Sequence, residues 1–108
     1  MSASWGRMVE RYLNGSKQLR NVFLLVDIRH EPAATDRQMY EWIRAQGYEP
    51  VVLATKLDKI KRSQVDKQKK LIRLSLEMEK GAILIPFSSE TKQGRDEVYA
   101  LLEKPSET

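Results

Sequence analysis

Two short polar segments of the chain follow directly on apolar runs. Residues 55–58 (TKLD) come after the apolar run 51–54, and residues 88–90 (SSE) come after the largely apolar run 82–87. Short apolar runs bounded by polar residues are typical of buried strands. Because the carboxyl ends of parallel strands meet at one edge of a sheet, where open α/β folds bind their ligands, we expect the two segments to lie together.

Asp58 in the first segment has the chemistry to recognise guanine. Guanine presents its N1–H and its exocyclic amino group as adjacent donors, and a carboxylate has two acceptor oxygens that can accept both. Such charge-assisted bonds are worth about 1.5 to 3 kcal/mol each, and adenine, which lacks this donor pair, leaves the carboxylate unpaired. The stem of Lys56 can lie along the purine face, and the backbone N–H of Ser89 is placed to donate to the guanine carbonyl oxygen.

An ordinary charged turn is the alternative explanation for Lys56, Asp58 and Lys59. A four-residue pattern of this type also occurs by chance in many proteins. The second polar segment, 88–90, also follows an apolar run, and this repeated placement favours a ligand-binding site over an ordinary turn.

Strand-like and helical patterns alternate along the chain and would position these segments. Apolar, β-rich runs predict strands at 22–26, 51–54 and 82–87. Helical spacing and capping residues predict helices at 4–13, from Thr35 or Asp36 to Gly47, from a cap at Ser63 to Glu79, and at 95–102. The apolar positions expected to be buried in the second and third helices include Met39, Tyr40, Ile43, Leu71, Ile72, Leu74, Leu76 and Met78.

This alternation predicts an α/β fold with three parallel strands and flanking helices. If the strands lie in sequential order, both crossover helices fall on one face, and the last helix covers the other. One edge of the first strand, 22–26, is then left without a partner, and we expect the chain to form a homodimer by pairing these exposed edges.

Composition indicates a single soluble domain. The chain has 108 residues, of which 41% are hydrophobic and 31% charged, and it has no cysteine. It contains neither a recognisable signal peptide nor a membrane-length apolar run, so we expect a cytoplasmic protein without a membrane partner. The tail 105–108 is expected to be disordered.

Positive charge is concentrated between Lys56 and Lys80, within a net charge of +4. This stretch predicts a solvated helix face, with contact to RNA phosphate as the alternative; interleaved aromatic residues, which stack on bases, are absent from it.

Taken together, the motifs resemble the carboxyl-terminal half of the EngB (YihA/YsxC) family, bacterial Ras-like GTPases associated with assembly of the large ribosomal subunit. The resemblance spans nearly the whole chain and rests on the segments 25–32 (LVDIRHEP), 36–42 (DRQMYEW), 52–59 (VLATKLDK) and 86–91 (PFSSET). It implies a truncated P-loop-GTPase-like (Rossmann-like) fold of three layers, with 1–108 a single partial GTPase domain.

The resemblance also implies site residues and partners. It carries guanine recognition onto Thr55, Lys56 and Asp58, with Ser88 and Ser89 forming the second base loop. Thr55 stands where most GTPases have asparagine. GTP or GDP is the implied ligand, and RNA or protein of the large ribosomal subunit the implied partner.

The family's phosphate-binding elements do not occur in this sequence. It contains no GxxxxGK(S/T) loop and no DxxG element. The sequence therefore lacks the backbone N–H groups and the lysine that bind the phosphates in such GTPases, and it lacks the Mg²⁺ ligands. We therefore expect no catalytic residue and no metal site, no hydrolysis, and weak binding of GTP or GDP at best. His30, the only histidine, is expected to have a structural role, because spacing identifies no acidic partner or nucleophile for it.

Three functions stay open on this evidence. The first is a guanine-nucleotide-binding portion of a ribosome-assembly GTPase, inactive alone. The second is a module that binds RNA or the ribosome through the basic helix without nucleotide. The third is a small α/β enzyme of unrelated chemistry, for which the sequence offers no nucleophile and base.

Overall fold

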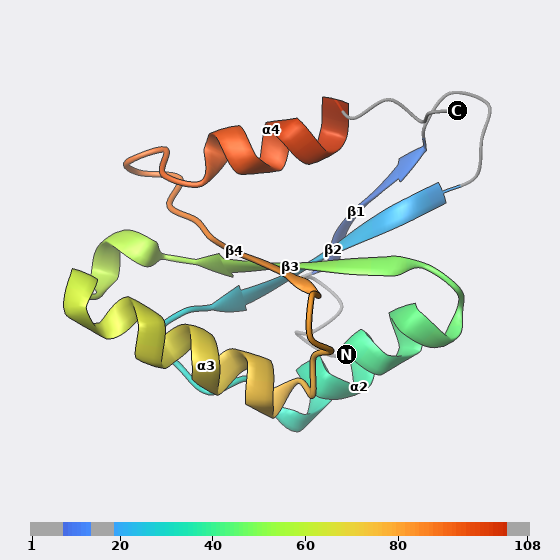
Figure 1. Cartoon of the computed structure of the whole chain (residues 1–108), viewed down its shortest axis with the longest axis horizontal. Helices are drawn as coiled ribbons and strands as arrows, with labels where there is room; N and C mark the ends of the chain where they lie inside the picture. The colour runs from blue at the N-terminus through green and yellow to red at the C-terminus, as the bar shows by residue number, and fades with distance from the viewer. Residues whose placement is uncertain (1–7, 14–18, 104–108) are drawn as a thin grey trace.

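The computed structural model of the chain describes residues 8–13 and 19–103. Strands and helices alternate through most of this length (Figure 1). The elements are, in order, β1 (Met8–Leu13), β2 (Leu19–Asp27), α2 (Ala34–Ala45), β3 (Glu49–Thr55), the 3-10 helices η1 (Leu57–Lys59) and η2 (Arg62–Gln64), α3 (Val65–Ser75), β4 (Ile83–Pro86) and α4 (Arg95–Glu103).

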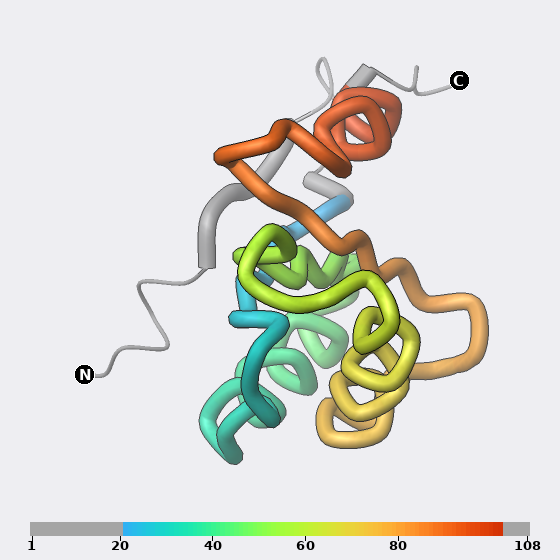
Figure 2. The backbone as a smooth tube through the Cα atoms, turned by 90° about the vertical axis from the view of Figure 1, so that its left-hand side faces the viewer, coloured from blue at the N-terminus to red at the C-terminus, as the bar shows by residue number. Residues whose placement is uncertain are grey.

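One sheet contains the four strands in the order β1-β2-β3-β4. Strands β2, β3 and β4 are parallel, which confirms the predicted three-stranded parallel arrangement. The register pairs Asp27 with Thr55 and Ala54 with Pro86. The carboxyl ends of the three strands therefore lie side by side, on the left of Figure 1 and toward the viewer in Figure 2.

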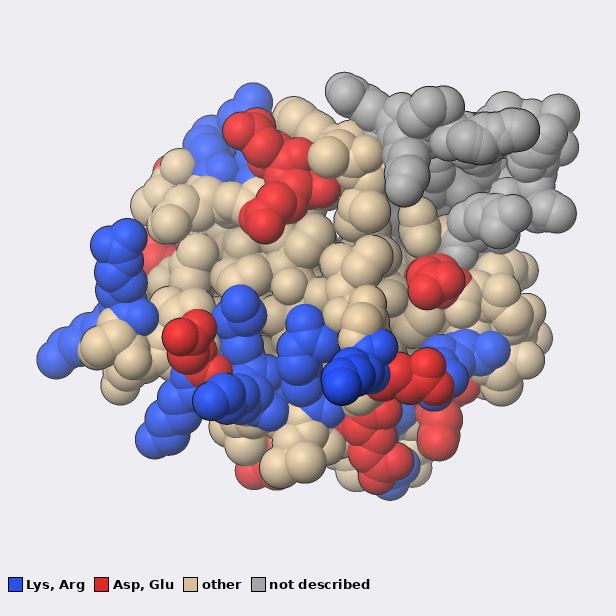
Figure 3. Space-filling model, in the orientation of Figure 1, with Lys and Arg blue, Asp and Glu red and all other residues tan. Residues whose placement is uncertain are grey.

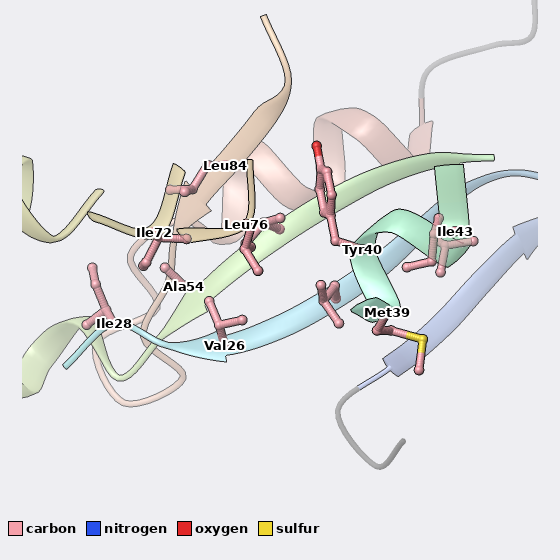
Figure 4. Packing of buried hydrophobic residues seen from close by; sticks show 12 residues of the cluster. Val26, Ile28, Met39, Tyr40, Ile43, Ala54, Ile72, Leu76 and Leu84 are labelled. Carbon is pink, nitrogen blue, oxygen red and sulfur yellow. The ribbon is translucent and has the colours of Figure 1, made fainter. Parts of the chain in front are cut away.

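Helices α2 and α3 cover one face of this sheet, as the sequential strand order predicts. Met39, Tyr40 and Ile43 of α2 are buried there, as expected from their helical spacing (Figure 4). Ile72 of α3 is fully buried against the same cluster. The two crossover connections thus bury a continuous apolar layer beneath the strands.

Helix α4 covers the opposite face, which makes the fold three-layered (Figure 1). Its Val98, Leu101 and Leu102 pack against a second buried cluster on the strands. That cluster consists of Phe23, Val51, Leu53 and Ile85. Because the strands are buried on both faces, they carry nearly continuous apolar runs instead of alternating ones.

The segment Met8–Leu13 is a strand, so the helix predicted at 4–13 is wrong over these residues; 4–7 lie outside the described ranges. β1 runs antiparallel to β2, with Met8 opposite Leu24 and Arg11 opposite Val22, and with register shifts between the pairs. Valine and tyrosine suit a strand at least as well as a helix, and an unpaired strand edge offers backbone donors and acceptors that override weak helical spacing. Consequently the edge of 22–26 is not free, and the homodimer predicted from an exposed edge there loses its basis.

Helix α3 is shorter than predicted, ending at Ser75 instead of Glu79. Glu77 adopts a left-handed conformation with φ of 56°, which ends the helix and turns Met78 back onto the core. Ser63 is not its cap, since residues Arg62–Gln64 form η2. The predicted burial of Leu74 is wrong: its side chain is 76% exposed, because it lies two positions from both Ile72 and Leu76 and so points to the opposite side of the helix.

A groove of about 620 Å³ runs along β4 between α3 and α4. Arg73 lies on its α3 side, where its Nη1 donates to the carbonyl oxygen of Ala82 at 3.0 Å. Glu97 lies on its α4 side.

The expected disordered tail 105–108 lies outside the described residues. Within the ranges that the structure does describe, no helix combines the length and the apolar character needed to cross a membrane.

Replacing Leu24 by alanine tests the packing of the core. Leu24 is fully buried, so Leu24→Ala should lower the free energy of unfolding by about 2 to 5 kcal/mol, measured by urea denaturation. Leu74→Ala, the same change at a site that is 76% exposed, should cost less than about 0.5 kcal/mol. Similar losses for the two variants would contradict this burial pattern.

Candidate functional site

Thr55, the last residue of β3, holds the loop that follows β2. Its Oγ1 donates to the carbonyl oxygen of Val26 at 3.1 Å, and its own carbonyl oxygen accepts from the N–H of Ile28 at 2.9 Å. The hydroxyl of Thr55 is therefore hydrogen-bonded within the protein, where it fixes the ends of β2 and β3 relative to each other.

Lys56 turns the chain sharply after β3. It has φ of 64° and ψ of 34°, a left-handed conformation that costs a non-glycine residue roughly 1–2 kcal/mol. The turn places the N–H of Leu57 3.0 Å from the carbonyl oxygen of Phe87, at the end of β4. This bond ties the loop after β3 to the loop after β4, while the side chain of Lys56 stays exposed.

Asp58 and Ser88 meet across these two loops, although they are 30 positions apart in the sequence. The hydroxyl of Ser88 donates to Oδ1 of Asp58 at 2.8 Å. Oδ2 lies 3.7 Å from the Nζ of Lys59, and the carboxylate side chain is 18% exposed. The bond from Ser88, helped by the charge of Lys59, lowers the pKa of Asp58 below its ordinary value, so the group is ionised at neutral pH.

Ser88 is fully buried, and every hydrogen-bonding position of its hydroxyl is used. Its Oγ accepts from the N–H groups of Glu90 and Thr91, both at 3.1 Å, and donates its proton to Asp58. Ser88 therefore positions the carboxylate of Asp58 from behind instead of facing a ligand. Ser89, the next residue, is exposed, and in the described part of the chain its N–H has no acceptor.

Gly94 closes the loop that contains Ser88. The N–H of Ser88 donates to the carbonyl oxygen of Gln93 at 3.1 Å, which folds the loop back on itself. Gly94 has φ of +87°, and a Cβ at this position would lie 2.3 Å from the carbonyl oxygen of Pro86. The glycine is thus required both for its backbone conformation and for its close approach to the end of β4.

A fork between Arg29 and Asp27 stands at the end of β2. Nε of Arg29 donates to Oδ1 at 3.0 Å, Nη2 donates to Oδ2 at 2.8 Å, and the backbone N–H of Arg29 donates to Oδ1 at 2.9 Å. The side-chain bonds from Arg29 are the main reason that the pKa of Asp27 falls to about 2. No pattern in the segment 27–30 (DIRH) predicts this fork.

Gln68 of α3 holds this loop from below, and sequence reasoning missed it. Its Nε2 donates to the carbonyl oxygen of Ile28 at 2.8 Å. His30, by contrast, is exposed, and its N–H donates to the carbonyl oxygen of Asp27 at 3.2 Å. Loop geometry, and not residue type, determines that Gln68 supports this loop through its side chain while the side chain of His30 is exposed.

The arrangement brings together most of the predicted residues. Asp58 and Ser89 face outward at the carboxyl edge, with Lys56 exposed beside them, while Thr55 and Ser88 lie beneath and support the loops. A fixed carboxylate next to an available N–H suits a ligand with paired donors and a nearby acceptor. Among residues 8–13 and 19–103, no three metal-binding side chains (histidine, cysteine, aspartate or glutamate) lie close enough to hold a metal ion.

Gly94→Ala tests the closure of this loop. The left-handed conformation and the overlap with the carbonyl oxygen of Pro86 should together lower the free energy of unfolding by about 2 to 5 kcal/mol. Gly47→Ala is the matched control, since Gly47 has φ of +90° but open space around its Cβ position, and it should cost only about 1–2 kcal/mol. Equal losses in thermal or urea denaturation would argue against the close approach.

Ser88→Ala tests the bond to Asp58. Without the hydroxyl, the pKa of Asp58 should rise toward its ordinary value of 3.8, measured by NMR titration of the carboxyl carbon. Because the folded-state pKa is lowered, the stabilisation from this bond is present above pH 3.8 and is lost as the pH falls through the folded-state pKa. Ser89→Ala should leave this pKa unchanged; an equal rise in both variants would mean that Ser88 is not its cause.

No protein-family model matches the chain, but curated relatives do. It is 56% identical over 103 residues to the "Probable GTP-binding protein EngB" of Lachnospira eligens, covering 95% of this chain and 49% of the relative. The proteins of the same name from Lachnoclostridium phytofermentans and Clostridioides difficile are 51% identical over 104 residues and 52% identical over 95 residues. These alignments cover 96% and 88% of this chain, and 52% and 47% of the relatives.

The chain thus spans about half the length of the curated relatives that it matches. Over that half the alignments extend along nearly the whole of this chain, covering 95% and 96% of it. The chain therefore corresponds in sequence, over 88–96% of its own length, to about half of each of these EngB proteins.

Proposed function

We propose that this chain binds guanine nucleotides and that Asp58 recognises the base. The observation that carries the proposal is the bond between Ser88 and Asp58, which holds an ionised carboxylate at the carboxyl edge of the sheet. Relatives that are named GTP-binding proteins support the same ligand class.

Each residue of the site has a distinct role in this proposal. Asp58 accepts from the N1–H and the amino group of guanine, and the free N–H of Ser89 donates to the guanine carbonyl oxygen. The stem of Lys56 lies along the purine face with its ammonium in water. Thr55 and Ser88 do not touch the base; they fix the two loops that carry the contacts.

Holding the carboxylate in place before the ligand arrives reduces the entropic cost of binding. Ser88 supplies that restraint from a buried position, so it persists in the absence of ligand. Adenine would leave the same carboxylate without its paired donors, which disfavours ATP.

We propose that this chain binds guanine nucleotides without hydrolysing them. Phosphoryl transfer depends on a phosphate-binding loop and on Mg²⁺ held near it, and the sequence contains no GxxxxGK(S/T) motif. Base contacts alone should therefore bind GTP or GDP only weakly.

A second candidate function is the binding of RNA, including RNA of the large ribosomal subunit, through the surface of η2 and α3. Lys61, Arg62, Lys67, Lys69 and Lys70 lie there, and none of them takes part in an ion pair within the described ranges. Lys and Arg side chains gather over this part of the molecule in Figure 3. Such a surface attracts a phosphate backbone without base specificity.

Titration with guanosine, GDP and ATP tests the first proposal. Wild-type protein should bind guanosine and GDP but not ATP, and Asp58→Ala should weaken guanosine binding at least about tenfold, because two charge-assisted bonds are lost. Asp96 is an exposed aspartate on α4, so Asp96→Ala is the control and should leave the affinity for guanosine unchanged. Calorimetry at neutral pH gives the dissociation constants.

Equal affinity for guanosine and ATP, or no effect of Asp58→Ala, would refute guanine recognition by Asp58. RNA binding that weakens steeply with salt and is indifferent to Asp58→Ala would favour the second function instead.

A further inference from the structure

We propose that Arg29 is a second contact for the nucleotide and donates to a phosphate oxygen. Asp27 is the positioning residue that holds its guanidinium over the carboxyl end of β2. This inference rests on the proposed function, since it assumes that the base lies between the loops after β3 and β4.

The sheet order gives the direction in which the nucleotide extends. The proposed base contacts come from the loops after β3 and β4, and β4 forms one edge of the described sheet. A ligand that continues along the carboxyl edge from the base toward the middle of the sheet therefore passes over the end of β2. Register pairs Asp27 with Thr55, so Arg29 stands beside the loop that carries Asp58.

The guanidinium of Arg29 is fixed instead of free in solvent. Its Nε and Nη2 bind the two oxygens of Asp27 at 3.0 and 2.8 Å, and the backbone N–H of Arg29 adds a third bond to the same carboxylate. Arginine offers five donors in a planar group, so the fork leaves donors unused. Nη1 has no protein acceptor among the described residues, and the side chain is 40% exposed.

The loop beneath Arg29 is equally well held. Ile28 is fully buried, its N–H donates to the carbonyl oxygen of Thr55, and its carbonyl oxygen accepts from Gln68 of α3 at 2.8 Å. These bonds come from β3 and from α3, so both a neighbouring strand and a helix fix the backbone at this point. A planar donor on a fixed loop is suited to a phosphate, whose oxygens accept in matching geometry.

The affinity gained from a bond between Arg29 and a phosphate is limited by Asp27, the residue that positions Arg29. The carboxylate of Asp27 offsets the charge of Arg29, and Asp58 adds further negative charge nearby. The hydrogen bonds to Asp27 are the main reason that the pKa of Arg29 is raised, with a smaller contribution from Asp58, so the guanidinium stays protonated. One hydrogen bond to a charged oxygen, weakened in this way, gives an affinity gain of about tenfold.

The test compares GDP with guanosine, because they share the base and the sugar and differ in phosphate. Wild-type protein should bind GDP about tenfold more tightly than guanosine, and Arg29→Gln should remove that difference while leaving guanosine affinity unchanged. Arg29→Lys, which keeps the charge but not the fork, should keep part of the difference. Arg37→Gln is the matched control, since Arg37 also pairs with a carboxylate, that of Glu41 at 3.8 Å, but does so along α2.

The outcomes separate the two proposals. If guanosine binds and Asp58→Ala abolishes it, but the ratio of GDP to guanosine affinity is the same with and without Arg29, the inference on Arg29 is wrong and guanine recognition stands. Loss of affinity for both ligands in Arg29→Gln would mean a structural role for the fork. If wild-type protein binds neither guanosine nor GDP at millimolar concentration, both proposals fail.

Discussion

Strand β3 is the element on which the rest of this structure depends. It has a parallel neighbour on each edge and helices on each face, and Val51, Val52 and Ala54 are fully buried. Side chains of a strand alternate between faces, so a shift of one residue in its register would move each of them to the wrong layer. The same register sets Asp27, Thr55 and Pro86 side by side at the carboxyl edge. The register of β3 therefore determines both the packing of the core and the placement of the loops.

At that edge, the buried hydroxyl of Ser88 holds the carboxylate of Asp58 in one position. Ser88 has one proton and two acceptor positions, and Asp58 together with two backbone N–H groups uses all three. A buried polar group that is fully bonded adds specificity without an unsatisfied partner. The loops after β3 and β4 are consequently held in one relative position, by side chains as well as by the bond between Leu57 and Phe87.

The sequence predicted the three parallel strands, because the apolar runs and the spacing of Met39, Tyr40 and Ile43 reflect burial directly. Given a sequential strand order, it also predicted the layer of each crossover helix. It also predicted which loops meet. It did not predict β1, since the pairing of Met8–Leu13 depends on the edge of a distant strand and not on local pattern.

The candidate site shows the same division between local pattern and tertiary contact. Residue types suggested Asp58 and the serine loop as candidates, but not that Ser88 is buried behind the carboxylate, nor that Arg29 and Asp27 form a fork. The early end of α3 depends on a left-handed Glu77, a conformation that glutamate rarely adopts and that no sequence signal announces.

The outer strand β4 has a consequence for how the protein behaves at high concentration. An unpaired strand edge invites addition of a strand from another molecule and hence aggregation. Here the carbonyl oxygen of Ala82, just before the strand, accepts a hydrogen bond from Arg73, and Pro86, at the end of the strand, has no N–H to donate. Between them lie only three residues, Ile83 to Ile85. The β4 margin of the described sheet thus offers an incoming strand too few backbone partners for a stable ladder, which disfavours aggregation through this edge.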